Sequence, residues 1–234
     1  MNLRNFAVAS AAAVSLLASA GAAGAAITVT DIEVGNIQGP VYLNGNKTIL
    51  DWDSPIAAGF AFTGPDVPGA TYERDGSLGL DGGQSAPPPT GTGAYETTDY
   101  YTVTSNGGPH EASLTVLGGN TLKKFSFYLG SPDAYNYLNF YSGATLVASL
   151  SGPAIWDGTW DDVPFQGDQS WGYRVYYDLG GSNIDKITFR STGNSFEFDG
   201  LAGVVPEPSS WALMILGFGG IGAAMRSRRK LAIA

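Results

Sequence analysis

The sequence predicts an all-β fold, an antiparallel β-sandwich of jelly-roll-like form, flanked by an N-terminal signal peptide and a C-terminal transmembrane helix. Three observations lead to this prediction. The composition combines 33 Gly and 13 Pro with only 14% charged residues, which favours short strands joined by tight turns. Apolar and aromatic runs recur about every 8 to 12 residues, without a long helical period. An uncharged apolar segment lies near each end of the sequence.

Alternation of apolar and polar residues predicts the strands and their faces. Phe125, Phe127 and Leu129 occupy alternate positions, so they share one face, which we expect to be core, while the residues between them face solvent. Ile187 and Phe189 alternate in the same way. The predicted strands are Ile27–Val34, Asp99–Thr104, Ala112–Leu117, Leu122–Leu129, Tyr135–Tyr141, Ala144–Leu150, Tyr173–Leu179, Ile184–Arg190 and Ser195–Leu201.

Turn residues predict how these strands are connected. Ser142 and Gly143 separate two strands, which predicts a two-residue β-hairpin. The segment Asp81 to Gly93 is rich in Pro and Gly and almost free of apolar residues, so it cannot nucleate packing. We expect it to be a loop across the sandwich or an internal linker.

The first 26 residues have the pattern of a secretory signal peptide. Arg4 supplies the positive start, Phe6 to Leu17 the apolar stretch, and Ala18 to Ala26 the small residues that signal peptidase requires. A buried N-terminal helix is the alternative, but this run has no polar face, as an amphipathic helix would need. The sequence therefore predicts a signal peptide over 1–26 and a sandwich domain over 27–204.

The segment Ser209 to Met225 contains no charged residue over 17 positions, the lower limit for a helix that crosses a hydrocarbon core of about 30 Å. Basic residues directly after such a span stay cytoplasmic, so the domain before it lies outside the inner membrane. The basic residues that follow the span are Arg226, Arg228, Arg229 and Lys230.

The segment 205–230 begins with Val205, Pro206, Glu207 and Pro208, followed in order by Trp211, the Gly-rich span and the basic cluster. In this order and spacing these residues resemble a PEP-CTERM sorting signal. The resemblance implies that a membrane-embedded cysteine protease, an exosortase, recognises Pro-Glu-Pro at the outer membrane boundary and removes the helix. A simple membrane anchor is the alternative.

The chemistry of the motif suits recognition by a protease. Pro206 and Pro208 lack amide donors and bias the residues before them toward an extended conformation. Glu207 offers one charge to read, and Trp211 lies where an indole anchors a helix at the membrane interface.

The segment Phe125 to Leu150 resembles the sandwich domain of a group of cyanobacterial and proteobacterial exosortase-dependent surface proteins. Phe196 to Gly203 is similar to the final strand of such domains. This resemblance implies a location outside the inner membrane and does not imply an activity. The residues that carry it are Gly130, Ser131, Asp133, Tyr135 and Asn136.

The charge of the sandwich domain excludes several classes of partner. Between Ile27 and Val205 lie seven basic and 20 acidic residues, a formal charge near −13. Such a domain repels phosphate backbones and anionic headgroups, so we expect no nucleic-acid partner. The expected partners are the exosortase, the membrane before processing, and polysaccharide.

Few residues suggest catalysis or a bound cofactor. His110 is the only histidine, and no nucleophile elbow accompanies it, which disfavours a hydrolytic triad. A glycosidase needs only two carboxylates, so composition leaves that reaction open. No cofactor is expected, although loops at Asp51–Asp53 and Asp157–Asp162 have the oxygen ligands that calcium takes. The alternative for these acids is a solvated surface.

Trp156, Trp160 and Trp171 lie close together in a Gly- and Asp-rich stretch. Exposed indoles beside carboxylates commonly stack on sugar rings, which makes these residues the candidate glycan-binding site. The alternative is that the indoles pack on the sandwich core, the more frequent position of Trp in β proteins.

The leading hypothesis is a non-catalytic exported surface or extracellular-matrix protein, processed by an exosortase and associated with exopolysaccharide or biofilm. Its precursor is expected in the inner membrane, and its mature form at the cell surface or outside the cell. A carbohydrate-binding module is the first alternative, and a secreted glycoside hydrolase is the second.

Overall fold

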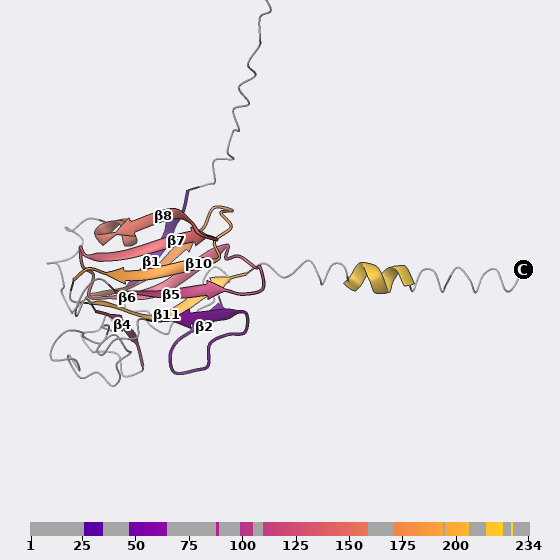
Figure 1. Cartoon of the computed structure of the whole chain (residues 1–234), viewed down its shortest axis with the longest axis horizontal. Coiled ribbons are helices and arrows are strands. Elements are labelled where there is room, and N and C mark those ends of the chain that lie inside the picture. The colour runs from indigo at the N-terminus through magenta and orange to yellow at the C-terminus, as the bar shows by residue number, and fades with distance from the viewer. Residues whose placement is uncertain are drawn as a thin grey trace, which may run out of the picture.

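The computed structural model describes residues 26–34, 47–64, 88, 99–104, 110–158, 171–193, 195–205, 214–221 and 226. Two antiparallel sheets pack face to face in the sandwich (Figure 1). Sheet A has the order β1-β9-β6-β11-β2, with β4 also paired to β11, and sheet B has the order β3-β5-β10-β7-β8. The strands are β1 (Thr28–Val34), β2 (Lys47–Leu50), β3 (Phe60–Thr63), β4 (Tyr101–Val103), β5 (His110–Val116), β6 (Lys124–Gly130), β7 (Asn136–Ser142), β8 (Thr145–Ser151), β9 (Gly172–Asp178), β10 (Lys186–Ser191) and β11 (Phe196–Val204).

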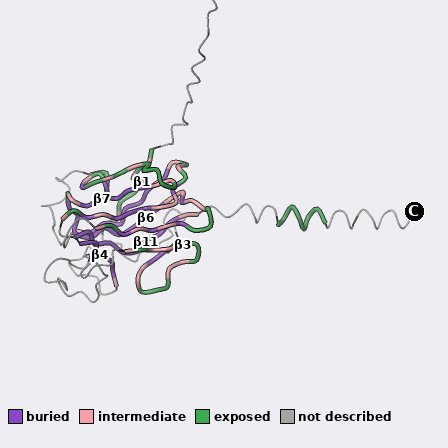
Figure 2. The backbone as a smooth tube through the Cα atoms, viewed as in Figure 1, coloured by how far each residue is buried: buried purple, intermediate pink, exposed green. Residues whose placement is uncertain are grey.

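Aromatic rings from both sheets fill the core. Phe198 of β11 stacks on Phe189 of β10 with ring centroids 4.0 Å apart, and Phe127 of β6 meets both rings edge-on. All three side chains have 0% exposure. Figure 2 shows exposed residues in the connections, along the edge strands β1 and β8, and in the helix at 214–221. The all-β sandwich predicted from composition and alternation is therefore confirmed.

The strand predictions agree closely with the structure. All the predicted strands are present, each with ends within three residues of the prediction. The prediction missed β2 and β3, which have four residues each. A strand this short carries too little alternation to be recognised alone, and each of the two is fixed by pairing with β11 or β5.

The predicted hairpin is present, but its turn lies one residue later. Ser142 pairs with Thr145, so the turn residues are Gly143 and Ala144. Gly143 has a φ of 58°, which glycine adopts without strain. Its amide donates to both carboxylate oxygens of Asp185 at 3.0 Å, a long-range contact that local sequence does not indicate.

The expectation that the second face of β6 and β10 is solvated was wrong for its central residues, whereas Lys124, Lys186 and Arg190 at the strand ends are half-buried. Ser126, Tyr128 and Thr188 all have 0% exposure. On sheet A, Pro88 lies against Gly130 on this outer face, where a Cβ on the glycine would come within 3.1 Å of three Pro88 atoms. On sheet B, the amide of Asn139 donates to Thr188 at 3.1 Å. Both outer faces thus carry buried polar residues.

The phenol of Tyr101 predicts sensitivity to alkali. It packs among Trp52, Phe62 and Phe198, and its burial raises the pKa of Tyr101 to about 12. An unfolded tyrosine ionises near pH 10. The raised folded pKa means that this stabilisation is complete below about pH 10 and is lost as the pH rises through about 12. We expect the urea midpoint to fall across this window, and to fall less in Tyr101→Phe. Identical pH profiles for the two proteins would contradict this assignment.

Candidate functional site

The strand β11 leads directly into the predicted sorting segment. It lies inside sheet A, with β6 on one side and β2 and β4 on the other. All its residues from Phe196 to Gly203 are buried. Pro206, Glu207, Pro208 and Trp211 follow within eight positions, outside the described residues. The sorting segment therefore begins at the end of a strand that is buried and has neighbouring strands on both sides.

Contacts at the end of β11 fix the point from which this segment leaves. The amide of Lys123 donates to the carbonyl of Val204 at 2.8 Å, and Gly203 pairs with Lys47 across to β2. A Cβ on Gly203 would lie 2.6 Å from Leu122, so the strand packs closely there. Next to this end is a half-open pocket of about 260 Å³. Its lining residues are Lys47, Thr48, Ile49, Ala57, Ala58, Phe60, Gly203, Val204 and Val205.

A β-bulge interrupts β11 between Asp199 and Ala202. Gly200 has a φ of 55°, the left-handed conformation typical of such bulges. The amide of Gly200 donates to the Asp199 carboxylate at 2.5 Å, and its carbonyl accepts from Arg174 Nη1 at 2.8 Å. The bulge thus turns the amide and carbonyl of Gly200 away from the strand pairing, and the side chains of Asp199 and Arg174 bind these two groups.

Arg174 lies at the centre of a buried polar network on the outer face of sheet A. Its guanidinium is fully buried and also donates to Ser126 Oγ at 3.5 Å. Burial lowers the pKa of Arg174, while nearby Tyr176, Asp199 and Glu33 oppose that effect. The Tyr176 hydroxyl donates to Glu33 Oε2 at 2.8 Å. Sequence reasoning missed this network, although the Asp-Gly pair at 199–200 is a turn signal inside a predicted strand.

Replacing Arg174 with Met is expected to lower the free energy of unfolding by about 1.5–3 kcal/mol. The variant leaves the buried Gly200 carbonyl without its charged donor and Asp199 without its countercharge. Urea denaturation checks the value. Arg190→Met is the matched control, because that half-buried guanidinium lies over the Tyr137 ring at 5.3 Å, a contact with an expected contribution of about 0.5–1 kcal/mol. Equal losses in both variants would refute the role given to Arg174.

Residues 204–230 match the family described as the PEP-CTERM protein-sorting motif. The chain carries a PEP-CTERM sorting motif. This confirms the resemblance seen in the sequence, with a start one residue before the predicted boundary. The PEP-CTERM motif implies an exported, membrane-anchored precursor that depends on an exosortase for processing. Its first matched residue, Val204, is also the last residue of β11.

The described part of the PEP-CTERM span is helical. Residues 214–221 form a helix, and Ile215, Leu216 and Phe218 are each about 70% exposed. Among the residues that the structure describes, no helix is both long and apolar enough to cross a bilayer. Arg226 is described, whereas Arg228, Arg229 and Lys230 lie outside the described residues, as does the predicted signal peptide up to residue 25.

The candidate glycan-binding indoles do not share one environment. Trp156 is 2% exposed and stacks on Tyr173 at 6.4 Å, so it offers no face to a sugar ring. Trp171 is half-buried and packs on the same Tyr173 at 5.3 Å. Trp160 lies outside the described residues. For Trp156 the structure agrees with core packing, the alternative that the sequence left open.

The candidate calcium loops are described only in part. The Asp51 carboxylate accepts from the Ser54 amide at 3.0 Å, and Asp53 accepts from the Asp99 amide at 3.3 Å, so both stabilise loop backbone. In the described ranges, no three His, Cys, Asp or Glu side chains gather in a way that could hold a metal ion. Asp161 and Asp162 are not among the described residues.

Two carboxylates, Glu197 and Asp199, occupy the outer face of β11 two residues apart. Their exposures are 1% and 0%, and Glu197 accepts a short hydrogen bond from Ser195. A glycosidase pair must flank a substrate in an open cleft. This pair is closed off from solvent and therefore does not form such a site.

No curated protein matches this chain. Among solved structures it is similar to the catalytic unit of a thermostable GH87 alpha-1,3-glucanase from Streptomyces thermodiastaticus strain HF3-3, with 13% identity and a TM-score of 0.30. The match covers 62% of this chain and 25% of the other, so the chain spans about a quarter of that structure.

Proposed function

We propose that this chain is a non-catalytic exported surface protein whose β-sandwich is delivered by exosortase processing. The precursor is held in the inner membrane by the span at 209–225, and the mature form lies at the cell surface or outside the cell. One observation carries the proposal. The PEP-CTERM motif begins at Val204, the residue at which β11 ends, so cleavage within the motif would leave the sandwich intact.

The packing of β11 supports delivery of a folded domain. Phe196 to Gly203 are buried and paired on both sides, so loss of the residues after Val205 removes no strand from either sheet. The buried pair Glu197 and Asp199 has no access to substrate, so these two carboxylates do not supply a glycosidase site. Association with exopolysaccharide is part of the proposal and rests on the resemblance to exosortase-dependent surface proteins.

The intact mass of the exported protein tests this function. In a host with an exosortase, the mature protein is expected to begin after the signal peptide and to end within the Pro-Glu-Pro region. In the same host without the exosortase, the protein is expected to keep its tail. A tail of equal length in both hosts would overturn the proposal. Turnover of common polysaccharides by the mature protein would overturn its non-catalytic part.

A further inference from the structure

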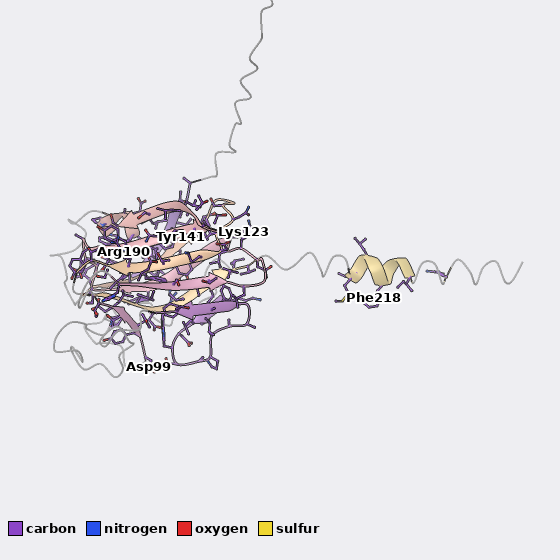
Figure 3. The ribbon with its side chains drawn as sticks, in the orientation of Figure 1. Asp99, Lys123, Tyr141, Arg190 and Phe218 are labelled. Atoms are coloured by element: carbon purple, nitrogen blue, oxygen red, sulfur yellow. The ribbon has the colours of Figure 1, made fainter. Side chains whose placement is uncertain are left out.

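All four lysines of the sandwich domain lie at the end from which the sorting segment leaves. Figure 3 labels Lys123 at this end and Arg190 at the opposite one. Lys47 pairs with Gly203, Lys124 pairs with Val204, and the Lys123 amide binds the Val204 carbonyl. Lys186 begins β10 near the bridge between Leu122 and Ile184. We call these four residues the lysine rim. They are Lys47, Lys123, Lys124 and Lys186.

The lysine rim is a local positive region on an acidic domain. On the strand ends and turns around it, the described acids are Asp178 and Asp185, so four positive and two negative charges leave +2. Both acids also accept from backbone amides, Asp178 from Gly180 at 2.8 Å and Asp185 from Gly143 at 3.0 Å. The domain as a whole is near −13, from seven basic and 20 acidic residues.

The rim is tethered close to the membrane in the proposed precursor. Four peptide steps separate Val205 from Ser209, where the apolar span begins, and they reach about 14 Å at full extension. Lipid headgroups occupy about 5 to 8 Å of that distance. The remaining gap is comparable with the Debye length of about 8 Å at physiological salt, so headgroup charge acts on the rim.

An exposed aliphatic residue accompanies the charges. Leu117 is 45% exposed, and its amide donates to the Gly59 carbonyl at the start of β3, on the same end of the sandwich. The turn after it uses Gly118 and Gly119, both with positive φ. Surfaces that bind anionic membrane interfaces combine basic residues with exposed apolar residues, as the four lysines and Leu117 do here.

We infer that the lysine rim docks the precursor's sandwich on anionic lipid headgroups of the membrane that anchors it. This inference rests on the proposed function, because it needs the membrane-anchored precursor. Docking holds Pro206, Glu207 and Pro208 within the headgroup layer and orients the sandwich with its acidic remainder away from the lipid. The contact depends on the tether, so loss of the tail after processing also weakens the attachment of the domain.

Lysine acylation by a membrane-impermeant reagent tests the docking. The full-length chain carrying Arg190→Lys is placed in phosphatidylcholine vesicles with or without phosphatidylglycerol, and each lysine is followed by mass spectrometry. Rim lysines are expected to react about fivefold more slowly on vesicles with phosphatidylglycerol than on vesicles without it. This factor corresponds to the contribution of about 1 kcal/mol that each lysine gains near an anionic surface. The amine introduced at position 190, at the far end, is expected to react equally on both, and high salt should abolish the protection.

A second readout uses the absence of cysteine from the sequence. A fluorophore on Leu117→Cys is the single labelled thiol, and headgroup-quencher lipids report its depth. Quenching on anionic vesicles is expected to survive replacement of Lys47, Lys123 and Lys124 by Arg and to be lost when they are replaced by Glu. Arg190→Glu, the matched charge reversal at the far end, should leave quenching unchanged.

The outcomes separate this inference from the proposed function. No exosortase is present, so the result does not depend on processing. If the chain floats with both kinds of vesicle but its rim lysines react equally, docking is wrong and the anchored precursor stands. If the chain floats with neither, the anchor fails and docking fails with it. In a separate arm an exosortase is added to the vesicles. If the rim lysines are protected only in that arm, docking on lipid is wrong, and the rim instead binds an acidic surface of the protease.

Discussion

Glu207→Ala, and separately the pair Pro206→Ala and Pro208→Ala, should leave export intact and block processing. Neither change touches the signal peptide or the uncharged segment at 209–225, so translocation and retention in the membrane depend on unchanged residues. The changes remove the charge, or the two residues that lack amide donors, from the motif that the protease reads. We expect near-complete loss of the mature form, with full-length precursor in the inner-membrane fraction on immunoblots.

Glu111→Ala is the matched control for the lost charge. Glu111 is exposed on β5, so its removal changes the net charge equally without touching the sorting segment. That variant should be processed like the wild type. Normal processing of the Glu207→Ala protein would instead show that Pro-Glu-Pro plays no part in maturation, as the simple-anchor alternative holds.

Phe198→Ala should lower the free energy of unfolding by about 3–5 kcal/mol, the range for loss of a fully buried phenylalanine. The ring has 0% exposure and stacks on Phe189 at 4.0 Å, and Trp52, Tyr101 and Phe196 lie within 5.6 Å of its centroid. Its removal opens a cavity between the two sheets, in the strand that leads into the sorting motif. Urea denaturation followed by tryptophan fluorescence measures the loss.

Leu146→Ala provides the comparison for this core substitution. Leu146 lies on the edge strand β8 and is 50% exposed, so its truncation removes little buried surface. We expect a change within about 0.5 kcal/mol. A loss below about 1 kcal/mol in Phe198→Ala would contradict the packing described for the core.

Local alternation of apolar and polar residues predicted which residues of the strands face the core. Contacts with residues distant in sequence determine whether the outer faces are buried. Phe125 and Phe127 were predicted to be buried from their spacing alone, and both are. Ser126 and Tyr128 were expected to face solvent, because nothing within β6 indicates that Arg174 and Pro88 lie against that face. Burial of the outer face depends on residues about 40 to 50 positions away, which no window along the sequence can detect.

The sorting motif was predictable because all its parts are adjacent in sequence. Pro206, Glu207 and Pro208 precede an uncharged span and a basic cluster within 25 residues, and no tertiary structure is needed to see them together. The lysine rim was not predictable in this way. Lys47, Lys123 and Lys186 are more than 60 residues apart in sequence, and only the pairing of their strands brings them to one end. The total charge near −13 even suggested repulsion from anionic lipid.

Membrane fractionation with two epitopes tests whether exosortase processing separates the sandwich from its membrane span. One epitope is placed after Ile27 and the other after Ala234, in a host that has an exosortase. We expect the first epitope to appear outside the inner membrane on a protein that lacks the second. Equal retention of both epitopes in the membrane, on one full-length protein, would contradict this expectation.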